Sequence, residues 1–166
     1  PSWDIHNKWT KELGIPKKAS TYVNNLIDVL KGEKLPQEYL DFVDKESRRI
    51  AEKSRKSVPV LALLIRREVL KHNSGRKRNS IGKFASEIQF KFLSHKGKDF
   101  VKAWYFTSFL DYLDDNKDLI DKFSTESVES LFEKYQKESP RCFSVEIINF
   151  LRANIRELID DLTKTK

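Results

Sequence analysis

Side chains that bind phosphate gather in the middle of this sequence. Residues 45–98 hold 16 Lys or Arg against four Asp or Glu, a net charge of +12, whereas residues 1–44 carry −1 and residues 99–166 carry −4. Cationic side chains bind phosphates by direct attraction and by releasing counterions, and Arg also makes paired hydrogen bonds to phosphate or guanine. The candidates for such contacts are Arg48, Arg49, Arg55, Lys56, Arg66, Arg67, Lys71, Arg76, Lys77, Arg78 and Lys83. The pattern indicates a surface for a polyanion.

The hypothesis of an enzyme rests on Arg67 and His72. A histidine can move a proton during attack by a 2′-hydroxyl group, and an arginine can stabilise the charged phosphate. The Arg-x4-His pattern of residues 67–72 resembles the signature of HEPN ribonucleases, in which this Arg and His lie at a dimer cleft and cut RNA without a metal. Glu68 stands where that family often has a small polar residue. A surface histidine that interacts with the dipole at a helix end explains the same residues.

The sequence contains no pattern that indicates a metal site or a phosphate-binding loop. His6, His72 and His95 have no Cys or acidic partners at the spacing of a metal site. No glycine-rich loop of the kind that holds phosphates is present. We therefore expect no metal, no cofactor and no catalytic residue beyond the Arg67–His72 alternative.

The elements that must position these residues are helices. Gly, Pro and capping residues divide amphipathic segments at the spacing of a helix, and no run of alternating residues is flanked by hairpin turns. The expected helices cover about residues 2–13, 18–31, 36–56, 57–72, 80–96, 99–114, 118–123, 124–136 and 144–162. We predict an all-α fold, a single compact bundle of about six to eight helices that forms one domain over residues 1–166.

The expected third and fourth helices differ in polarity. Residues 45–56 are polar nearly all round, which indicates an exposed or ligand-bound helix. Residues 58–65 form the most apolar run of the chain and are followed at once by Arg66 and Arg67. We expect the fourth helix at the centre of the fold, with the binding surface formed by the third helix, the end of the fourth and the loop at 73–79.

Length and composition restrict the class of protein. A chain of 166 residues with 11 Phe, five Tyr and three Trp can bury a real core. No segment reaches the roughly 18 apolar residues of a membrane span, and the N-terminal residues do not resemble a secretory signal. Cys142 is the single cysteine, which fits a reducing compartment. An intracellular protein, cytoplasmic or nuclear, is the expectation.

Three functional hypotheses follow. The first is a protein that binds DNA or RNA phosphates through the basic surface of residues 45–98 and is not an enzyme. The second is a helical adaptor that docks an acidic protein partner, and the acidic C-terminal third is a further surface for a protein contact. The third is a metal-independent, HEPN-like ribonuclease that uses Arg67 and His72.

Overall fold

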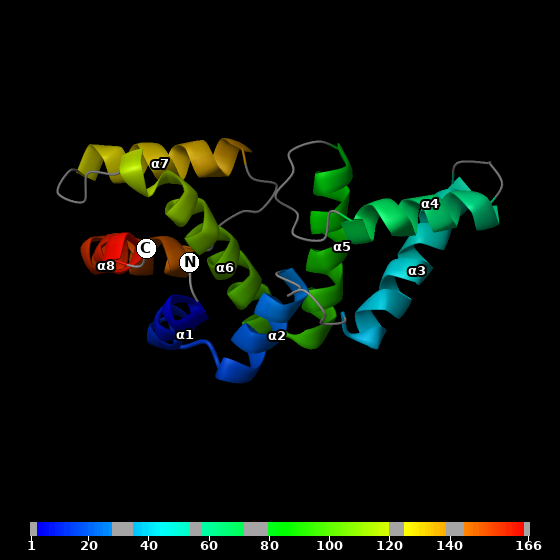
Figure 1. Ribbon diagram of the computed structural model, residues 1–166, viewed down its shortest axis with the longest axis horizontal. Coiled ribbons are helices and arrows are strands. Elements are labelled where there is room, and N and C mark those ends of the chain that lie inside the picture. Colours follow the sequence, from blue (N-terminus) through cyan, green and yellow to red (C-terminus); the bar gives the residue numbers. More distant parts are fainter. Residues whose placement is uncertain are drawn as a thin grey trace. The chain divides into compact units, whose positions relative to one another are not determined.

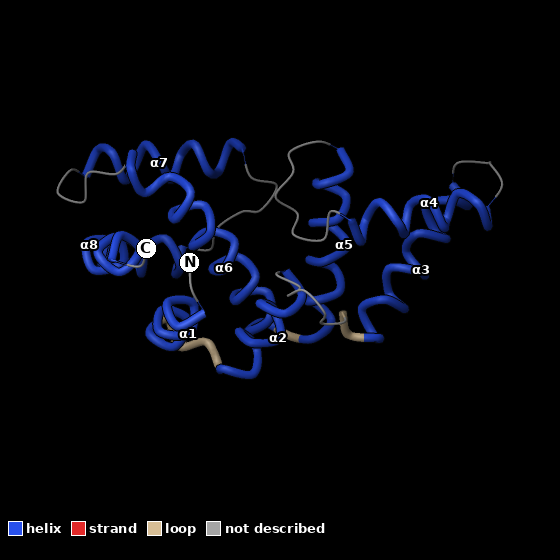
Figure 2. The backbone as a smooth tube through the Cα atoms, in the orientation of Figure 1, coloured by secondary structure: helices blue, strands red, loops and turns tan. Residues whose placement is uncertain are grey.

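The computed structural model describes residues 3–27, 35–53, 58–71, 80–119, 125–138 and 145–164 (Figure 1). Helices account for nearly all of them, and no strand occurs within these ranges (Figure 2). The α-helices are α1 (Trp3–Glu12), α2 (Lys17–Ile27), α3 (Gln37–Lys53), α4 (Val58–Lys71), α5 (Ser80–Lys96), α6 (Lys98–Asn116), α7 (Thr125–Glu138) and α8 (Val145–Lys164), with a 3-10 helix, η1 (Lys117–Leu119), after α6. The all-α prediction is confirmed.

Local signals place several helix ends. Gly14 follows α1 with a φ of +85°, and its N–H donates to the carbonyl of Lys11 at 2.9 Å. The N–H of Ile15 donates to the carbonyl of Thr10 at 2.9 Å, which completes the paired bonds of a Schellman motif. The carbonyl of Pro36 accepts from the N–H groups of Tyr39 and Leu40 in the first turn of α3, so the proline directly precedes the helix, where its missing N–H costs nothing.

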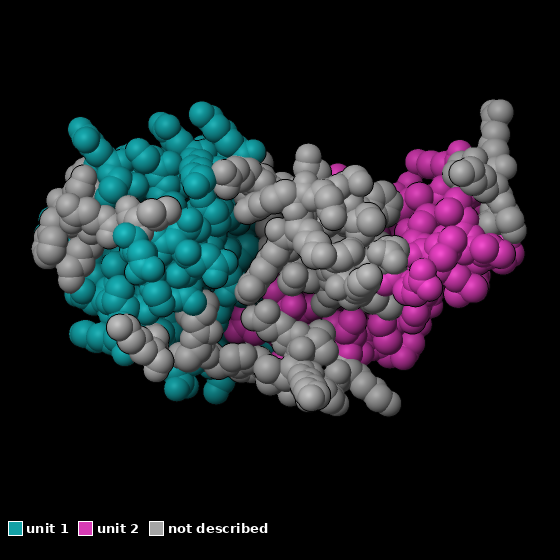
Figure 3. All heavy atoms as spheres, turned by 45° about the horizontal axis from the view of Figure 1, so that its top comes forward, with its two compact units in different colours: residues 1–23, 98–166 teal, residues 24–97 magenta. Residues whose placement is uncertain are grey.

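The chain divides into two compact units (Figure 3). Unit 1 comprises residues 1–23 and 98–166, and unit 2 comprises residues 24–97. One division falls inside α2 and the other between Gly97, which has a φ of +134°, and the start of α6. The single domain expected over residues 1–166 stays a prediction, and each unit is described here by itself.

In unit 1 the long aromatic helix α6 lies among α1, α7 and α8 (Figure 1). Phe106, Phe109 and Leu113 of α6 are fully buried. The ring centroid of Phe109 lies 5.5 Å from that of Phe132 and 5.1 Å from that of Tyr135, both in α7. The apolar stripe of α8 buries Ile147, Leu151, Ile155, Leu158, Ile159 and Leu162. Unit 1 therefore has a closed aromatic core around α6.

In unit 2, α3 packs against α4 and α5, and α4 also packs against α5. Tyr39 and Val43 of α3 are fully buried, and the ring of Tyr39 meets that of Phe92 in α5 edge to face, with centroids 5.2 Å apart. Further large buried side chains of unit 2 are Ile88 and Leu93 of α5 and Leu26 and Ile27 of α2.

The prediction that the fourth helix lies at the centre of the fold is wrong. Val60, Leu63 and Leu64 of α4 are 60%, 67% and 45% exposed, and Ala62 is the buried residue among those α4 side chains that are described. The physical reason is the number of neighbours. Two helices of unit 2 cover one side of α4 and leave its opposite face open.

No helix in the described part of the chain is long and apolar enough to cross a membrane.

Candidate nucleic-acid interface

The net positive charge of the protein belongs entirely to unit 2. Unit 2 holds 17 Lys or Arg against nine Asp or Glu, a net charge of +8, whereas unit 1 holds 15 against 16, a net charge of −1. Charge confined to one unit creates a directed potential for anions, which an even distribution over the molecule does not. The candidate interface is therefore sought on unit 2.

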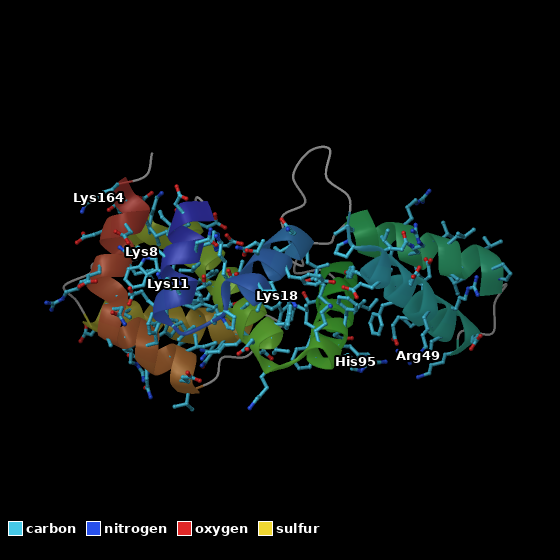
Figure 4. All side chains as sticks on the ribbon, turned by 90° about the horizontal axis from the view of Figure 1, so that it is seen from below. Lys8, Lys11, Lys18, Arg49, His95 and Lys164 are labelled. Atoms are coloured by element: carbon cyan, nitrogen blue, oxygen red, sulfur yellow. The ribbon has the colours of Figure 1, made fainter. Side chains whose placement is uncertain are left out.

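Four cations share the solvent-exposed face of α3. Lys45, Arg48, Arg49 and Lys53 are separated by the spacings that bring residues to one side of a helix, and all four are exposed. Figure 4 shows Arg49 extending away from the body of the helix. At 1.5 Å per residue this cationic face is about 12 Å long, over which one DNA strand carries about three phosphates. Glu52 is the acidic residue within the face.

Arg49 is held by a buried carboxylate. Glu46 is 4% exposed, and its Oε2 atom lies 3.0 Å from both Nε and Nη2 of Arg49. The Nζ atom of Lys91, in α5, donates to Oε1 of Glu46 at 2.8 Å. Burial opposes ionisation of Glu46, but the hydrogen bonds and charges of Lys91 and Arg49 outweigh it and lower the pKa of Glu46 below 4.5. Glu46 thus joins α3 to α5 through Lys91, and it also pairs with Arg49 of its own helix, so only part of the charge of Arg49 remains for a ligand.

The other three cations of the face differ from Arg49. No carboxylate in the described ranges pairs with Lys45, Arg48 or Lys53. Their ammonium and guanidinium groups are therefore available to phosphate oxygens without first breaking an ion pair. These three residues are the strongest candidates for phosphate contacts.

A second group of arginines lies where α3 meets α4. Arg66 of α4 forms an ion pair with Asp44 of α3, which identifies the side of α3 that faces α4. Arg48 is four residues after Asp44 and so lies one turn along the same side of α3. Arg67 is exposed on α4. Arg66 and Arg48 therefore border the α3–α4 contact, whereas Arg67 lies about 100° around α4 from Arg66. Arg48 also belongs to the cationic face of α3.

The remaining predicted contacts stay predictions. Lys71 ends α4 and Lys83 lies in α5, but nothing of their side chains is described. Arg55, Lys56, the basic loop residues Arg76, Lys77 and Arg78, and His72 of the ribonuclease hypothesis lie outside the described residues. Among the residues that are described, no group of three or more His, Cys, Asp or Glu is placed to hold a metal ion.

The sequence-based choice of residues missed Lys45, Lys53 and Glu46. Lys45 lies one turn before Arg49 and Lys53 one turn after it, so the spacing of charges along the helix was enough to include them. Glu46 was not recognisable as buried, because its burial depends on α5, whose Lys91 is 45 residues away in the chain.

Comparison with known proteins adds no further constraint. No family model matches the sequence, and neither the curated proteins nor the solved structures include a significant match. Fold and site together define an all-α protein whose second unit is strongly cationic.

Proposed function

We propose that this protein binds DNA or RNA through phosphate contacts made by unit 2, with the cationic face of α3 at the centre of the interface. The observation that carries the proposal is the separation of charge, +8 on unit 2 and −1 on unit 1. Further support comes from Lys45, Arg48 and Lys53, three exposed cations on one helix face with no carboxylate partner in the described ranges. Binding to a nucleic acid also implies an intracellular location.

The recognition would be independent of base sequence. Lys has no preferred geometry on phosphate, and a face of alternating cations can follow a backbone without inserting into a groove. Phosphate contacts release counterions, so the logarithm of the affinity should fall linearly with the logarithm of the salt concentration, by about 0.9 per contact on duplex DNA. We expect duplexes of unrelated sequence to bind with similar affinity.

The test removes the three cations together. Fluorescence anisotropy of labelled duplex DNA, single-stranded DNA and RNA is measured at two salt concentrations for the wild type and for the Lys45→Ala, Arg48→Ala, Lys53→Ala triple variant. We expect the affinity to fall by roughly tenfold or more and the salt slope by about 0.9 per lost contact. A second variant, with Arg76, Lys77 and Arg78 replaced by Ala, determines whether that loop contributes.

A matched control separates a local interface from total charge. Lys11, Lys18 and Lys164 are exposed on unit 1, and their replacement by Ala removes the same three charges (Figure 4). Equal losses in the two triple variants would show that net charge alone drives binding and would remove α3 from the interface. RNA cleavage that disappears in His72→Ala, with the fold retained, would support the ribonuclease hypothesis instead.

A further inference from the structure

The open face of α4 carries an apolar stripe. Val60, Leu63 and Leu64 occupy positions i, i+3 and i+4, and Arg67 follows at i+7, so all four lie on one side of the helix. All four are exposed. Among the large apolar side chains of unit 2 that are described, Val60, Leu63, Leu64 and Phe90 are exposed, and the others are partly or fully buried. Three neighbouring aliphatic side chains in water therefore indicate a contact surface.

Phosphate binding does not explain this stripe. Aliphatic side chains gain nothing against a charged backbone, whereas burying a leucine against an apolar surface is favourable. The spacing of the stripe is the pattern by which one amphipathic helix packs its apolar face against another. The stripe thus suits a helical protein segment.

The surroundings of the stripe specify the charge of that segment. Arg67 continues the stripe toward the C-terminus of α4, and Arg66 and Arg48 border it on the side of α3. Unit 2 as a whole carries +8. A partner with Asp or Glu beside its apolar residues would be attracted to this border, and a basic partner would be repelled.

A second copy of the chain does not meet this requirement. Parallel pairing of two α4 helices would place Arg67 against Arg67, and antiparallel pairing would place Arg67 over the aliphatic residues. Either arrangement brings one unit of charge +8 against another. Like charges that face each other across an interface repel, so self-association on this face is disfavoured.

We infer that the stripe of Val60, Leu63, Leu64 and Arg67 on α4 is a docking site for an acidic amphipathic helix of a partner protein. The apolar face of that helix covers the three aliphatic side chains, and its flanking carboxylates meet Arg67 and Arg48. The site adds a protein contact to unit 2 that is distinct from the phosphate contacts of α3, although both use Arg48.

The experiment uses the full chain and two synthetic helical peptides of about 18 residues, long enough to form a helix. Both carry Leu at helical i, i+3, i+4 and i+7 positions; one has Glu on the flanks and the other has Lys. Binding is followed by fluorescence anisotropy for the wild type and for Leu63→Asn, which shortens the stripe without changing the charge. The control is Val145→Asn, because Val145 of α8 in unit 1 is also highly exposed, at 73%.

We expect the acidic peptide to bind and the basic peptide to bind at least tenfold more weakly. Leu63→Asn should lower the affinity for the acidic peptide by about tenfold, whereas Val145→Asn should not change it. Equal binding of both peptides, no effect of Leu63→Asn, or a concentration-dependent dimer abolished by Leu63→Asn would each overturn the inference. Duplex DNA binding should be the same in Leu63→Asn and wild type. The peptide experiment can therefore fail while the proposal of phosphate binding stands, and the reverse.

Discussion

Units 1 and 2 each contain a helix rich in apolar residues, and the two helices differ in how far their apolar side chains are buried. In unit 1, α6 contacts α1, α7 and α8, and its Phe106, Phe109 and Leu113 are fully buried. In unit 2, α4 has neighbours on one side, and its Val60, Leu63 and Leu64 remain exposed. The difference shows that a high content of apolar residues does not by itself bury a helix. Whether its side chains are buried depends on how many other helices pack against it.

The units also differ in how their charges are compensated. Unit 1 has nearly equal numbers of cations and carboxylates, and several pair across helices, as Arg152 does with Glu129 at 2.6 Å. Unit 2 has eight more cations than carboxylates, and its buried Glu46 already serves two of them. Unit 1 has balanced charge and an enclosed core. Unit 2 has exposed charge and exposed apolar surface together, which is typical of a binding region.

The largest expected effect separates the two apolar helices. Phe109→Ala in α6 removes a fully buried ring and should lower the free energy of unfolding by about 3–5 kcal/mol. Leu63→Ala in α4 removes an exposed side chain and should change it by no more than about 0.5 kcal/mol. Urea denaturation followed by circular dichroism measures both. Comparable losses of stability in the two variants would mean that the α4 face is buried in solution, which would contradict the contrast between α6 and α4.

A smaller effect is expected from the carboxylate that joins α3 to α5. Glu46→Gln leaves Arg49 and Lys91 without their shared charge and should cost about 1–3 kcal/mol of stability at neutral pH. The cost is at the lower end for buried pairs because both cations are about half exposed.

The same carboxylate should make stability depend on pH. The pKa of Glu46 in the folded protein lies below its ordinary value of 4.5, so its contribution is present above that pH and is lost as the pH falls through the folded pKa. The stability difference between wild type and Glu46→Gln, measured by urea denaturation from pH 7 to pH 3, should therefore shrink in acid. Glu129→Gln is the control, since its pair with Arg152 is on the surface and should contribute little. A difference between wild type and Glu46→Gln that is constant with pH would contradict the ionised pair.

The smallest expected effect is a change in affinity for DNA, and it tests the difference in charge between the two units. Glu52 is the acidic residue within the cationic face of α3, and Glu52→Gln should raise the affinity for duplex DNA by about threefold through removal of local repulsion. Glu133→Gln changes the total charge by the same amount on an exposed site of unit 1 and should have no comparable effect. Anisotropy titrations at one fixed salt concentration measure both variants. A larger gain in Glu133→Gln would move the interface away from α3.

Much of the fold was predictable because its signals are local. Gly14 and Pro16 predicted the end of α1, Pro36 the start of α3 and Gly97 the break before α6, and the helices lie where these residues indicated. Of the short helix expected over 118–123, residues 118 and 119 belong to the 3-10 helix Lys117–Leu119, and the rest lies outside the described residues.

The candidate site was predictable only in part. The position of Arg48 in a polar helix correctly indicated an exposed cation. The same reasoning did not distinguish Arg48 from Arg49 or Arg66, although the latter two are paired with Glu46 and Asp44. Ion pairs depend on which side chains face each other after packing, and the charges of Lys and Arg alone contain no such information.

The sequence by itself determined the helical class, the helix ends and the location of the positive charge, because capping, glycine and proline conformations and side-chain charge act within a few residues. The tertiary structure alone decided that α6 is enclosed and α4 is open, and that Glu46 joins Arg49 to Lys91. These outcomes depend on contacts between segments far apart in the chain, since burial and ion pairing are properties of what surrounds a residue.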